Sequence, residues 1–419
     1  MTGFNSHYFE WAYGKTITIR FLTLPSNGGC LFMRSKSMNQ RTASSFNQSL
    51  HGYRGFCALL VFLFHSGNAG VISTAELGFG ADFLWTSLRY GVEMFFMISG
   101  YVILASLLRH ASIAEFLSER VIRIYAPWVP ALVAVSLVCA AFQAKTFAHV
   151  STSEGIGLFL VNLSLLPPLV AAPLIHRGSW SLTYEWVFYL AAAIAVALLR
   201  RPHSMQRWTI WPWLALSAAF VCFFPRATFF VTGVLVFLQR DWFERRRHWL
   251  RLPLLSMLVF LVAWRYTEVD EAELTITYLD FLSDSRWIAA LVAFLASLHM
   301  FASVVHRESR QLAFLDGRFF QFFGSISYSF YLWHALVMSL VKRIVTPYLV
   351  PHIGLALGFA VFVIASALIS LAVSWASWRL FEVHLARAVH RMRANPSARR
   401  VAAVSVQDVP RVEVRRTRA

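Results

Sequence analysis

The sequence predicts an all-α integral membrane protein with about ten transmembrane helices. Of its 419 residues, 58% are hydrophobic and only 14% are charged, whereas soluble domains carry roughly a quarter charged residues. The apolar residues also form separate runs, several of them close to the length of about 20 residues that a helix needs to cross the hydrocarbon core. Together these observations exclude an ordinary soluble domain.

Ten apolar segments are the predicted spans. They lie near residues 53–74, 91–108, 126–144, 179–199, 209–225, 226–240, 252–266, 286–305, 320–342 and 354–378. The fifth and sixth share one run that is broken only by Pro225 and Arg226. A further apolar stretch at 156–172 contains Pro167 and Pro168. We expect it to be re-entrant or interfacial, with an eleventh span as the alternative.

The distribution of charge predicts the orientation. The formal net charge is +17. Basic residues cluster between apolar runs and at the C-terminus, in segments 109–123, 200–208, 240–251, 306–318 and the tail. Because cytoplasmic loops are rich in Lys and Arg, both termini are expected in the cytoplasm, in a multi-pass protein of the plasma or inner membrane. This pattern favours a topology signal over a nucleic-acid-binding surface.

Three parts of the chain are expected. Residues 1–49 form a polar N-terminal extension, partly disordered or preceding the true start; residues 50–385 form the membrane domain, and residues 386–419 a disordered basic cytoplasmic tail. The extension has no secretory signal pattern. The four cysteines are scattered and form no C-x-x-C pair, so neither a disulfide framework nor a metal site is expected.

Arg54 and His65 are two polar residues in the first apolar run. They stand 11 residues apart, close to three full turns of an α-helix, so they fall on one face about 16 Å apart along the axis. In the predicted orientation, Arg54 lies near the cytoplasmic surface and His65 in the hydrocarbon zone. Polar groups at that depth are costly and are therefore functional candidates. A buried histidine near a cationic entry suggests proton transfer on a charged substrate.

Five segments occur in the order of a known family. They are LHGYRGFCALLVFLFH (50–65), GVEMFFMISGY (91–101), RVIRIYAP (120–127), SWSLTYEWVFY (179–189) and GSISYSFYLWH (324–334). With them the chain resembles the acyltransferase 3 family of membrane O-acyltransferases. Position 51 is His where the family commonly has Asp, and Phe381-Glu382 is followed by Val-His rather than Arg-Pro. The resemblance implies about ten helices and transfer of an acyl group from acyl-coenzyme A to a sugar hydroxyl.

Under this resemblance, His65 is expected to carry the chemistry. An O-acyl transfer needs a base that takes the proton of the attacking hydroxyl, and an imidazole with a pKa of about 6.5 suits that task. Alternatively, His65 itself accepts the acyl group and forms a covalent intermediate. Without the resemblance, a packing histidine bonded to a carbonyl would be the commoner explanation.

Arg54, Arg120 and Arg123 are the expected donor-binding residues at the cytoplasmic face. Arg120 and Arg123 are i,i+3 neighbours and present two guanidinium groups on one side of a helix. Guanidinium binds phosphate in bidentate fashion, and coenzyme A carries a pyrophosphate and a 3′-phosphate. The alternative is that these arginines only set the topology.

Glu185 is the second expected catalytic residue. Ser181, Glu185 and Tyr189 share one helix face at i,i+4 spacing, with Ser181 a further candidate for substrate binding. The carboxylate is expected to orient His65 or to contact an acceptor hydroxyl, unless it pairs with an arginine. For Glu93, nearer the end of its span, structural pairing is the expectation.

Tyr331 and His334 lie on one stripe of the ninth span and are candidate substrate-binding residues. Aromatic belts at the membrane interface explain Tyr and Trp residues equally well. No phosphate-binding loop of the Walker type occurs in the sequence.

The function expected is therefore transfer of an acetyl or other short acyl group from acyl-coenzyme A to a carbohydrate hydroxyl of a surface polysaccharide or lipid-linked glycan. Acyl-coenzyme A is a co-substrate, and no permanently bound cofactor, metal or nucleic acid is expected. A transporter or flippase in which His65 and Glu185 relay protons is the alternative, although transporters often show repeated halves. A structural subunit of a glycan-synthesis complex is the third.

Overall fold

The structure is a computed structural model. It describes residues 8–10, 16–18 and 47–385, apart from short gaps at 75–77, 111, 143, 145, 148–149, 171, 202 and 269–275. The predicted tail at 386–419 and most of the extension at 1–49 lie outside the described residues. Within that extension, strands β1 (Tyr8–Glu10) and β2 (Thr16–Thr18) pair in antiparallel fashion. The chain divides into two compact units.

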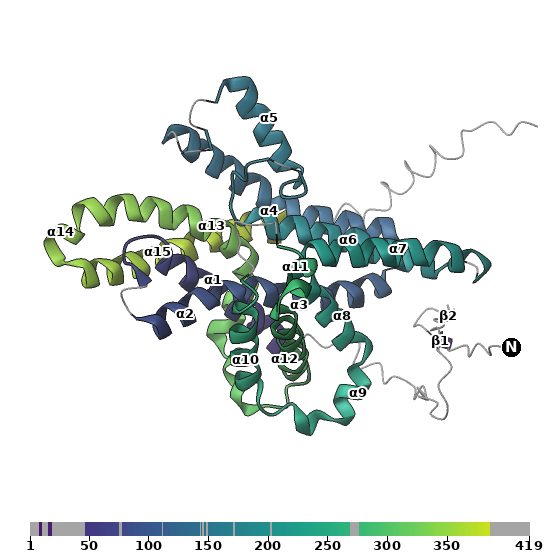
Figure 1. The fold of residues 1–419 in the computed structure, drawn as a ribbon. Coiled ribbons are helices and arrows are strands. Elements are labelled where there is room, and N and C mark those ends of the chain that lie inside the picture. Colours follow the sequence, from purple (N-terminus) through teal and green to yellow (C-terminus); the bar gives the residue numbers. More distant parts are fainter. Residues whose placement is uncertain are drawn as a thin grey trace, which may run out of the picture. The chain divides into compact units, whose positions relative to one another are not determined.

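Unit 1 comprises Met1–Asn68, Ser73–Leu117 and Trp180–Ser327, as far as they are described. Several of its helices pack directly on one another, including α3 on α8, α10 on α12, and α1 on α3 (Figure 1). Its elements are α1 (Gln48–Gly67), α2 (Phe79–Ser87), η2 (Leu88–Tyr90), α3 (Gly91–Arg109), α6 (Ser179–Leu199), α7 (His203–Phe223), η3 (Pro225–Ala227), α8 (Thr228–Leu238), α9 (Arg240–Arg245), η4 (Arg247–Trp249), α10 (Pro253–Arg265), α11 (Tyr278–Ser283), α12 (Arg286–His306) and η5 (Arg310–Asp316).

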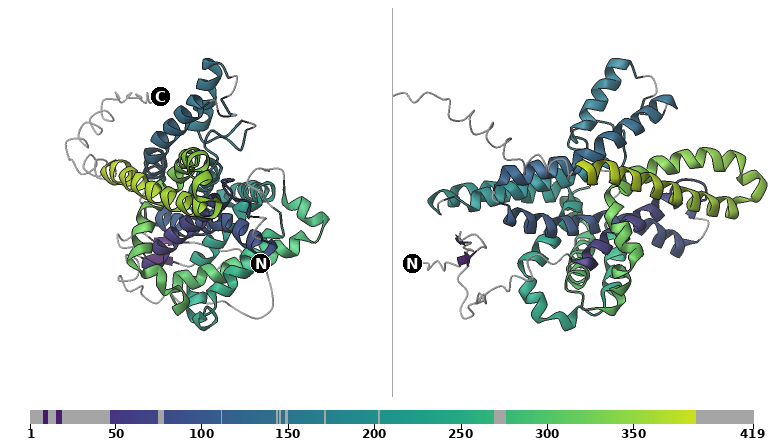
Figure 2. Two further views of the ribbon diagram at one scale, coloured as in Figure 1. Left: turned by 90° about the vertical axis from the view of Figure 1, so that its left-hand side faces the viewer. Right: turned by 180° about the vertical axis from the view of Figure 1, so that it is seen from behind.

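Unit 2 comprises Ala69–Ile72, Ser118–Ser179 and Tyr328–Ala419, again as far as described. Its complete helices are α5 (Thr152–Leu163), α14 (Val350–Ile353), α15 (Leu355–Ser377) and η6 (Trp378–Val383). Two long helices, α4 (Ile113–Ala141) and α13 (Arg318–Tyr348), begin in unit 1 and continue into unit 2. The short helix α14 joins α13 to α15, so that α13 and α15 form an antiparallel hairpin (Figure 2).

Five helical segments in the described chain are long and apolar enough to cross a membrane. They are Phe79–Arg109, Ile113–Ala141, Ser179–Leu199, Arg286–His306 and Leu355–Val383. A sixth candidate is the pair Trp208–Phe223 and Pro225–Leu238, which is bent by 119° at its break. The protein is therefore a helical, multi-pass membrane protein, as predicted.

The predicted number of ten spans is not confirmed. Each of the ten predicted segments does contain a helix. However, α8 has 11 residues and α10 has 13, which is shorter than the roughly 20 residues needed to cross the hydrocarbon core. The stretch at 156–172 forms α5, only 12 residues long, and it too is shorter than a full span.

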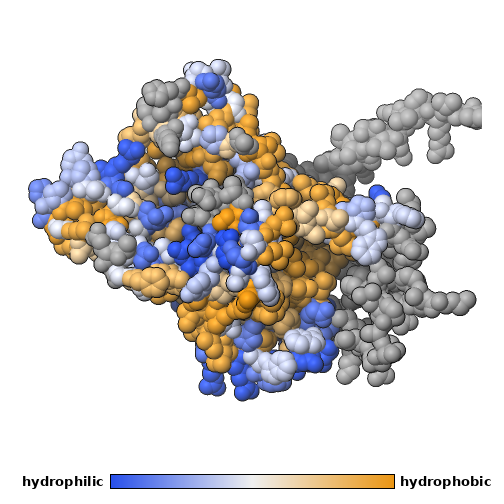
Figure 3. All heavy atoms as spheres, in the orientation of Figure 1, coloured by the Kyte–Doolittle hydropathy of each residue, from blue (hydrophilic) through white to orange (hydrophobic). Residues whose placement is uncertain are grey.

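Large apolar side chains are exposed along the long helices. Leu216 of α7, Leu295 of α12 and Leu368 of α15 are examples, with exposed fractions between 56% and 71%. Hydrophobic residues cover much of the face seen in Figure 3. Extended exposed apolar surface marks contact with a membrane or another apolar partner, which agrees with the membrane assignment.

Helices α3 and α8 are in backbone contact at Gly100 and Gly233. A Cβ atom at Gly233 would lie 2.0 Å from the carbonyl oxygen of Met97, and one at Gly100 would lie 2.1 Å from that of Phe230. Small residues allow membrane helices to approach this closely. Gly100 of the second family segment is thereby explained as a packing residue.

Replacing Gly233 by alanine is expected to destabilise the protein by about 1–3 kcal/mol, the usual cost of overpacking a tight interior. Unfolding of the purified protein in detergent measures the change. Gly157→Ala in α5 is the matched control, because a Cβ there meets no atom within 4 Å. Equal unfolding midpoints for Gly233→Ala and the wild type would contradict the interpretation.

Candidate active site

Arg54 and His65 both lie on α1, which runs from Gln48 to Gly67. The Asn47 side chain caps its start by accepting a hydrogen bond from the amide of Leu50. The helix ends at Gly67 rather than near residue 74 as predicted, so His65 lies in its last turn. Both side chains are half-buried. The common face and the spacing of about 16 Å follow from the helix, but His65 is nearer the helix end than the sequence suggested.

The start of α1 is fixed against the start of α13. His51 Nε2 contacts the carbonyl oxygen of Gln321 and the hydroxyl of Ser325, both at 3.1 Å. A Cβ on Gly55 would lie 2.8 Å from the amide nitrogen of Gly324. The residues on either side of Arg54 therefore pack against α13, which explains why the first family segment carries a glycine next to this arginine.

Glu185 accepts two hydrogen bonds from hydroxyl groups. Ser99 Oγ of α3 donates at 3.1 Å, and the Tyr189 hydroxyl, one turn further along α6, donates to the same carboxylate oxygen. The predicted shared face of Glu185 and Tyr189 is thus confirmed. Ser99 was missed by the sequence reasoning, although it lies within the second family segment. A role for Glu185 in orienting His65 stays a prediction, as does substrate binding by Ser181, which is buried at the start of α6.

Glu93 makes the ion pair expected of it. Arg226 Nε lies 3.5 Å from Glu93 Oε1, and the two side chains are 3% and 0% exposed. Trp264 Nε1 donates to the same carboxylate oxygen at 3.3 Å. The guanidinium of Arg226 also lies over the Trp180 ring, 4.6 Å from its centroid, a favourable cation–π distance. This buried cluster fixes Arg226 at the sharp bend between α7 and α8.

Arg120 and Arg123 lie in the part of α4 that belongs to unit 2. Arg120 is buried and Arg123 is exposed, and their spacing puts both on one side of the helix. The Tyr328 hydroxyl donates to the carbonyl oxygen of Ile124 at 3.0 Å, which fixes this turn to α13. Because Arg54 belongs to unit 1, the grouping of the three arginines into one donor site stays a prediction.

Tyr331 and His334 lie on the part of α13 that belongs to unit 2, and their spacing puts them on one side of the helix. The Tyr331 hydroxyl donates to the carbonyl oxygen of Gly178 at 2.9 Å. His334 Nδ1 lies 3.0 Å from the carbonyl oxygen of Phe330, and since a carbonyl only accepts, we assign a proton to Nδ1. Both residues are buried. Their hydrogen bonds are those of packing residues, and substrate binding by them stays a prediction.

His176 is a buried histidine that sequence reasoning missed. Its Nε2 donates to the carbonyl oxygen of Leu332 at 2.8 Å, and its ring packs edge-on against Trp128. Asn162 binds the same loop through Pro173 and Ile175. The loop that leads into the α6 motif is thus fixed from both sides. No periodic signal marks a loop residue of this kind.

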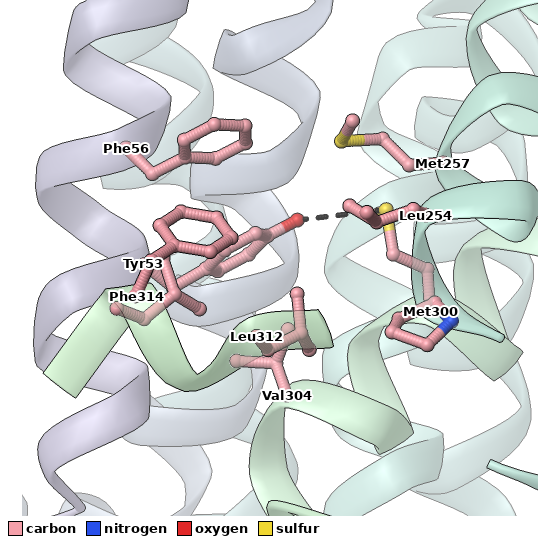
Figure 4. A pocket seen from close by; sticks show the side chains of 10 residues that line it. Tyr53, Phe56, Leu254, Met257, Met300, Val304, Leu312 and Phe314 are labelled. Atoms are coloured by element: carbon pink, nitrogen blue, oxygen red, sulfur yellow. Dashed lines mark hydrogen bonds between the residues drawn. The ribbon is translucent and has the colours of Figure 1, made fainter. Parts of the chain in front are cut away.

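A small apolar pocket lies on another side of α1 (Figure 4). The Tyr53 hydroxyl points across it and donates to Met300 Sδ at 3.7 Å. At about 100° per residue, Tyr53 points about 100° and Phe56 about 160° away from Arg54. The pocket is therefore not on the Arg54–His65 face. Its lining comes from α1, α10, α12 and η5: Tyr53, Phe56, Pro253, Leu254, Met257, Met300, Val304, Leu312, Phe314 and Leu315.

Comparison with known proteins decides the family. Residues 47–379 match a family described as an acyltransferase domain. The chain belongs to the acyltransferase 3 family. This match confirms the resemblance drawn from the five segments, and with it the prediction of an acyltransferase domain.

A curated relative agrees with this membership. The chain is 27% identical over 176 residues to "Acyltransferase MdmB" of Streptomyces mycarofaciens. The matched region covers 42% of this chain and 45% of that relative, so it spans less than half of the relative's length. No solved structure matches the chain significantly.

Proposed function

We propose that this membrane protein transfers an acetyl or other short acyl group from acyl-coenzyme A to a hydroxyl group of a carbohydrate. The observation that carries the proposal is the placement of Arg54 and His65 on one face of α1, inside a family domain of acyltransferases. The acceptor would be a surface polysaccharide or a lipid-linked glycan, and the enzyme would work in the plasma or inner membrane.

In the proposed mechanism, His65 acts as the base. It takes the proton of the acceptor hydroxyl while that oxygen attacks the thioester carbonyl. The carbon–sulfur bond then breaks, and the proton returns from the imidazolium to the leaving coenzyme A thiolate. The products are an O-acyl ester and free coenzyme A. If His65 instead accepts the acyl group first, its ring nitrogen attacks the thioester, the carbon–sulfur bond breaks, and the imidazole proton passes to the leaving thiolate. The acceptor hydroxyl then attacks the acyl-imidazole, the carbon–nitrogen bond breaks, and the freed imidazole takes the hydroxyl proton.

The arginines would hold the donor. Arg54, Arg120 and Arg123 are proposed to bind the pyrophosphate and the 3′-phosphate, since guanidinium matches phosphate oxygens in bidentate geometry. Arg54 and His65 lie about 16 Å apart along α1, and the pantetheine arm would bridge that distance. Glu185, with its two hydroxyl donors, is proposed to contact the acceptor or to orient His65.

The test is acyl transfer by the purified full chain in lipid nanodiscs. Acetyl-coenzyme A labelled in the acetyl group is supplied with lipid-linked glycans from the host membrane. We expect release of coenzyme A and base-labile label on the glycan. Acetyl-dephospho-coenzyme A, which lacks the 3′-phosphate, should show a raised KM.

Two results would contradict the proposed acyl transfer. Movement of glycan across a vesicle membrane without coenzyme A release would favour the transporter. Silence in both assays, despite correct insertion, would favour a structural subunit.

A further inference from the structure

The last turn of α1 is held from outside by the side chain of Trp85. The indole Nε1 of this α2 residue donates to the carbonyl oxygen of Leu63 at 2.8 Å. The Ser66 hydroxyl donates to the same oxygen, also at 2.8 Å. His65 lies between Leu63 and Ser66, so the backbone on its N-terminal side is fixed by a residue from another helix.

Gly67 makes room for this contact on the other side of His65. A Cβ atom there would lie 2.1 Å from Nε1 and 2.6 Å from Cδ1 of the Trp85 indole. These distances are far below a normal contact, so the indole occupies the space of a side chain at position 67. The indole thus contacts α1 at residues 63 and 67, which bracket His65.

Trp85 is itself held firmly. Helix α2 packs against α1 (Figure 1), and the Phe83 ring contacts the Tyr266 ring at the end of α10, with centroids 6.5 Å apart. Asp82 in the first turn of α2 accepts a hydrogen bond from the Thr74 hydroxyl at 2.5 Å. The indole is therefore presented to α1 from a helix anchored on both sides.

The ends of helices are where backbone order is lost most easily, because their terminal carbonyls lack partners within the helix. His65 lies in such an end, two residues before Gly67. A catalytic group displaced by about 1 Å can lose about 10²-fold in rate. A base in a fraying turn would therefore need an external support.

We propose that Trp85 is the positioning residue of His65, holding the imidazole for proton transfer through the Leu63 carbonyl and the Gly67 contact. This inference rests on the proposed function, in which His65 acts on the reacting groups. Trp85 touches neither donor nor acceptor in this assignment. It acts through the backbone turn that carries His65.

Two variants test the contact between Trp85 and the end of α1, one changed at Trp85 and the other at Gly67. Trp85→Phe keeps an aromatic ring but removes the N–H donor. Gly67→Ala keeps the indole but places a Cβ in its space, while alanine favours the helix by about 1 kcal/mol over glycine. Loss of activity in Gly67→Ala could not then come from a weaker helix. Trp208→Phe is the control, because Trp208 is 83% exposed.

In the nanodisc assay, we expect each single variant to lower kcat about tenfold, while KM for acetyl-coenzyme A changes less than twofold. The thermal midpoint of Trp85→Phe should stay close to the wild type, and Gly67→Ala should lower it only by the cost of overpacking. The double variant should be no worse than the poorer single one, because both changes break the same contact. Amide exchange of residues 63–67 should accelerate in Trp85→Phe.

Three outcomes overturn the inference. They are wild-type kcat in both variants, accelerated exchange without a change in kcat, and a parallel fall in stability and activity that also raises KM. An inactive wild type would instead overturn the proposed function. A fourth outcome concerns His65 itself: if His65→Ala is as active as the wild type, the turn is held for another purpose and the positioning role is overturned.

Discussion

His65→Ala is expected to lower the rate of coenzyme A release about 10²–10⁴-fold, the contribution typical of a positioned general base or acid. The protein should still insert and fold, because His65 is only half-buried in the last turn of α1. KM for acetyl-coenzyme A should change little, since the proposed donor-binding group on this helix is Arg54. Stopped assays of coenzyme A thiol in nanodiscs measure both constants.

Two comparisons make this result specific. His352→Ala removes an exposed histidine of α14 and should leave the rate unchanged. Arg54→Gln should mainly raise KM, because it removes a phosphate contact and leaves the base in place. A His65→Ala protein that inserts normally and acylates glycan at the wild-type rate would disprove the mechanism.

Periodicity and apolar runs predicted the helices well where no tertiary contact was needed. Helix α6 begins at Ser179 and ends at Leu199 as predicted, because a mainly apolar run with Glu185 as its one charged residue lies between Gly178 and Arg200. Helix α12 also begins at the predicted residue, Arg286. The i,i+4 face of Glu185 and Tyr189 followed from helix geometry alone.

Helix ends and long-range partners could not be predicted in the same way. The predicted span of α1 continues past the observed end at Gly67, and the Trp85 contact at that end comes from another helix. Short α8 and α10 looked like spans because hydropathy does not reveal where a helix bends or stops. Ser99 and His176 gave no signal of their own, since their partners come from other helices.

Glu93 also shows that long-range partners could not be predicted from the sequence. Its position near the end of an apolar span predicted structural pairing, and the pair exists. Its partner, Arg226, is far away in the sequence and was read only as a break between two spans. Burial predicts that a charge needs a partner, but only the fold decides which one.

Breaking this pair should strongly destabilise the protein. Arg226→Met removes the cation that pairs with the Glu93 carboxylate, which is 0% exposed, and loss of one partner of a buried pair costs about 3–5 kcal/mol. We expect a much lower unfolding midpoint in detergent and less folded protein in the membrane.

The double variant Glu93→Gln/Arg226→Met should recover most of the loss. Glutamine keeps an acceptor for Trp264, and methionine keeps a polarizable contact with the Trp180 ring. Because replacing both charges of a buried pair is often neutral or stabilising, the double variant should unfold within about 1 kcal/mol of the wild type. If the loss of stability in the double variant equals the sum of the losses in Glu93→Gln and Arg226→Met, the two residues act independently. Recovery would show instead that the two residues stabilise the bend at Arg226 as a pair. Each charge is then required chiefly because the other one is buried.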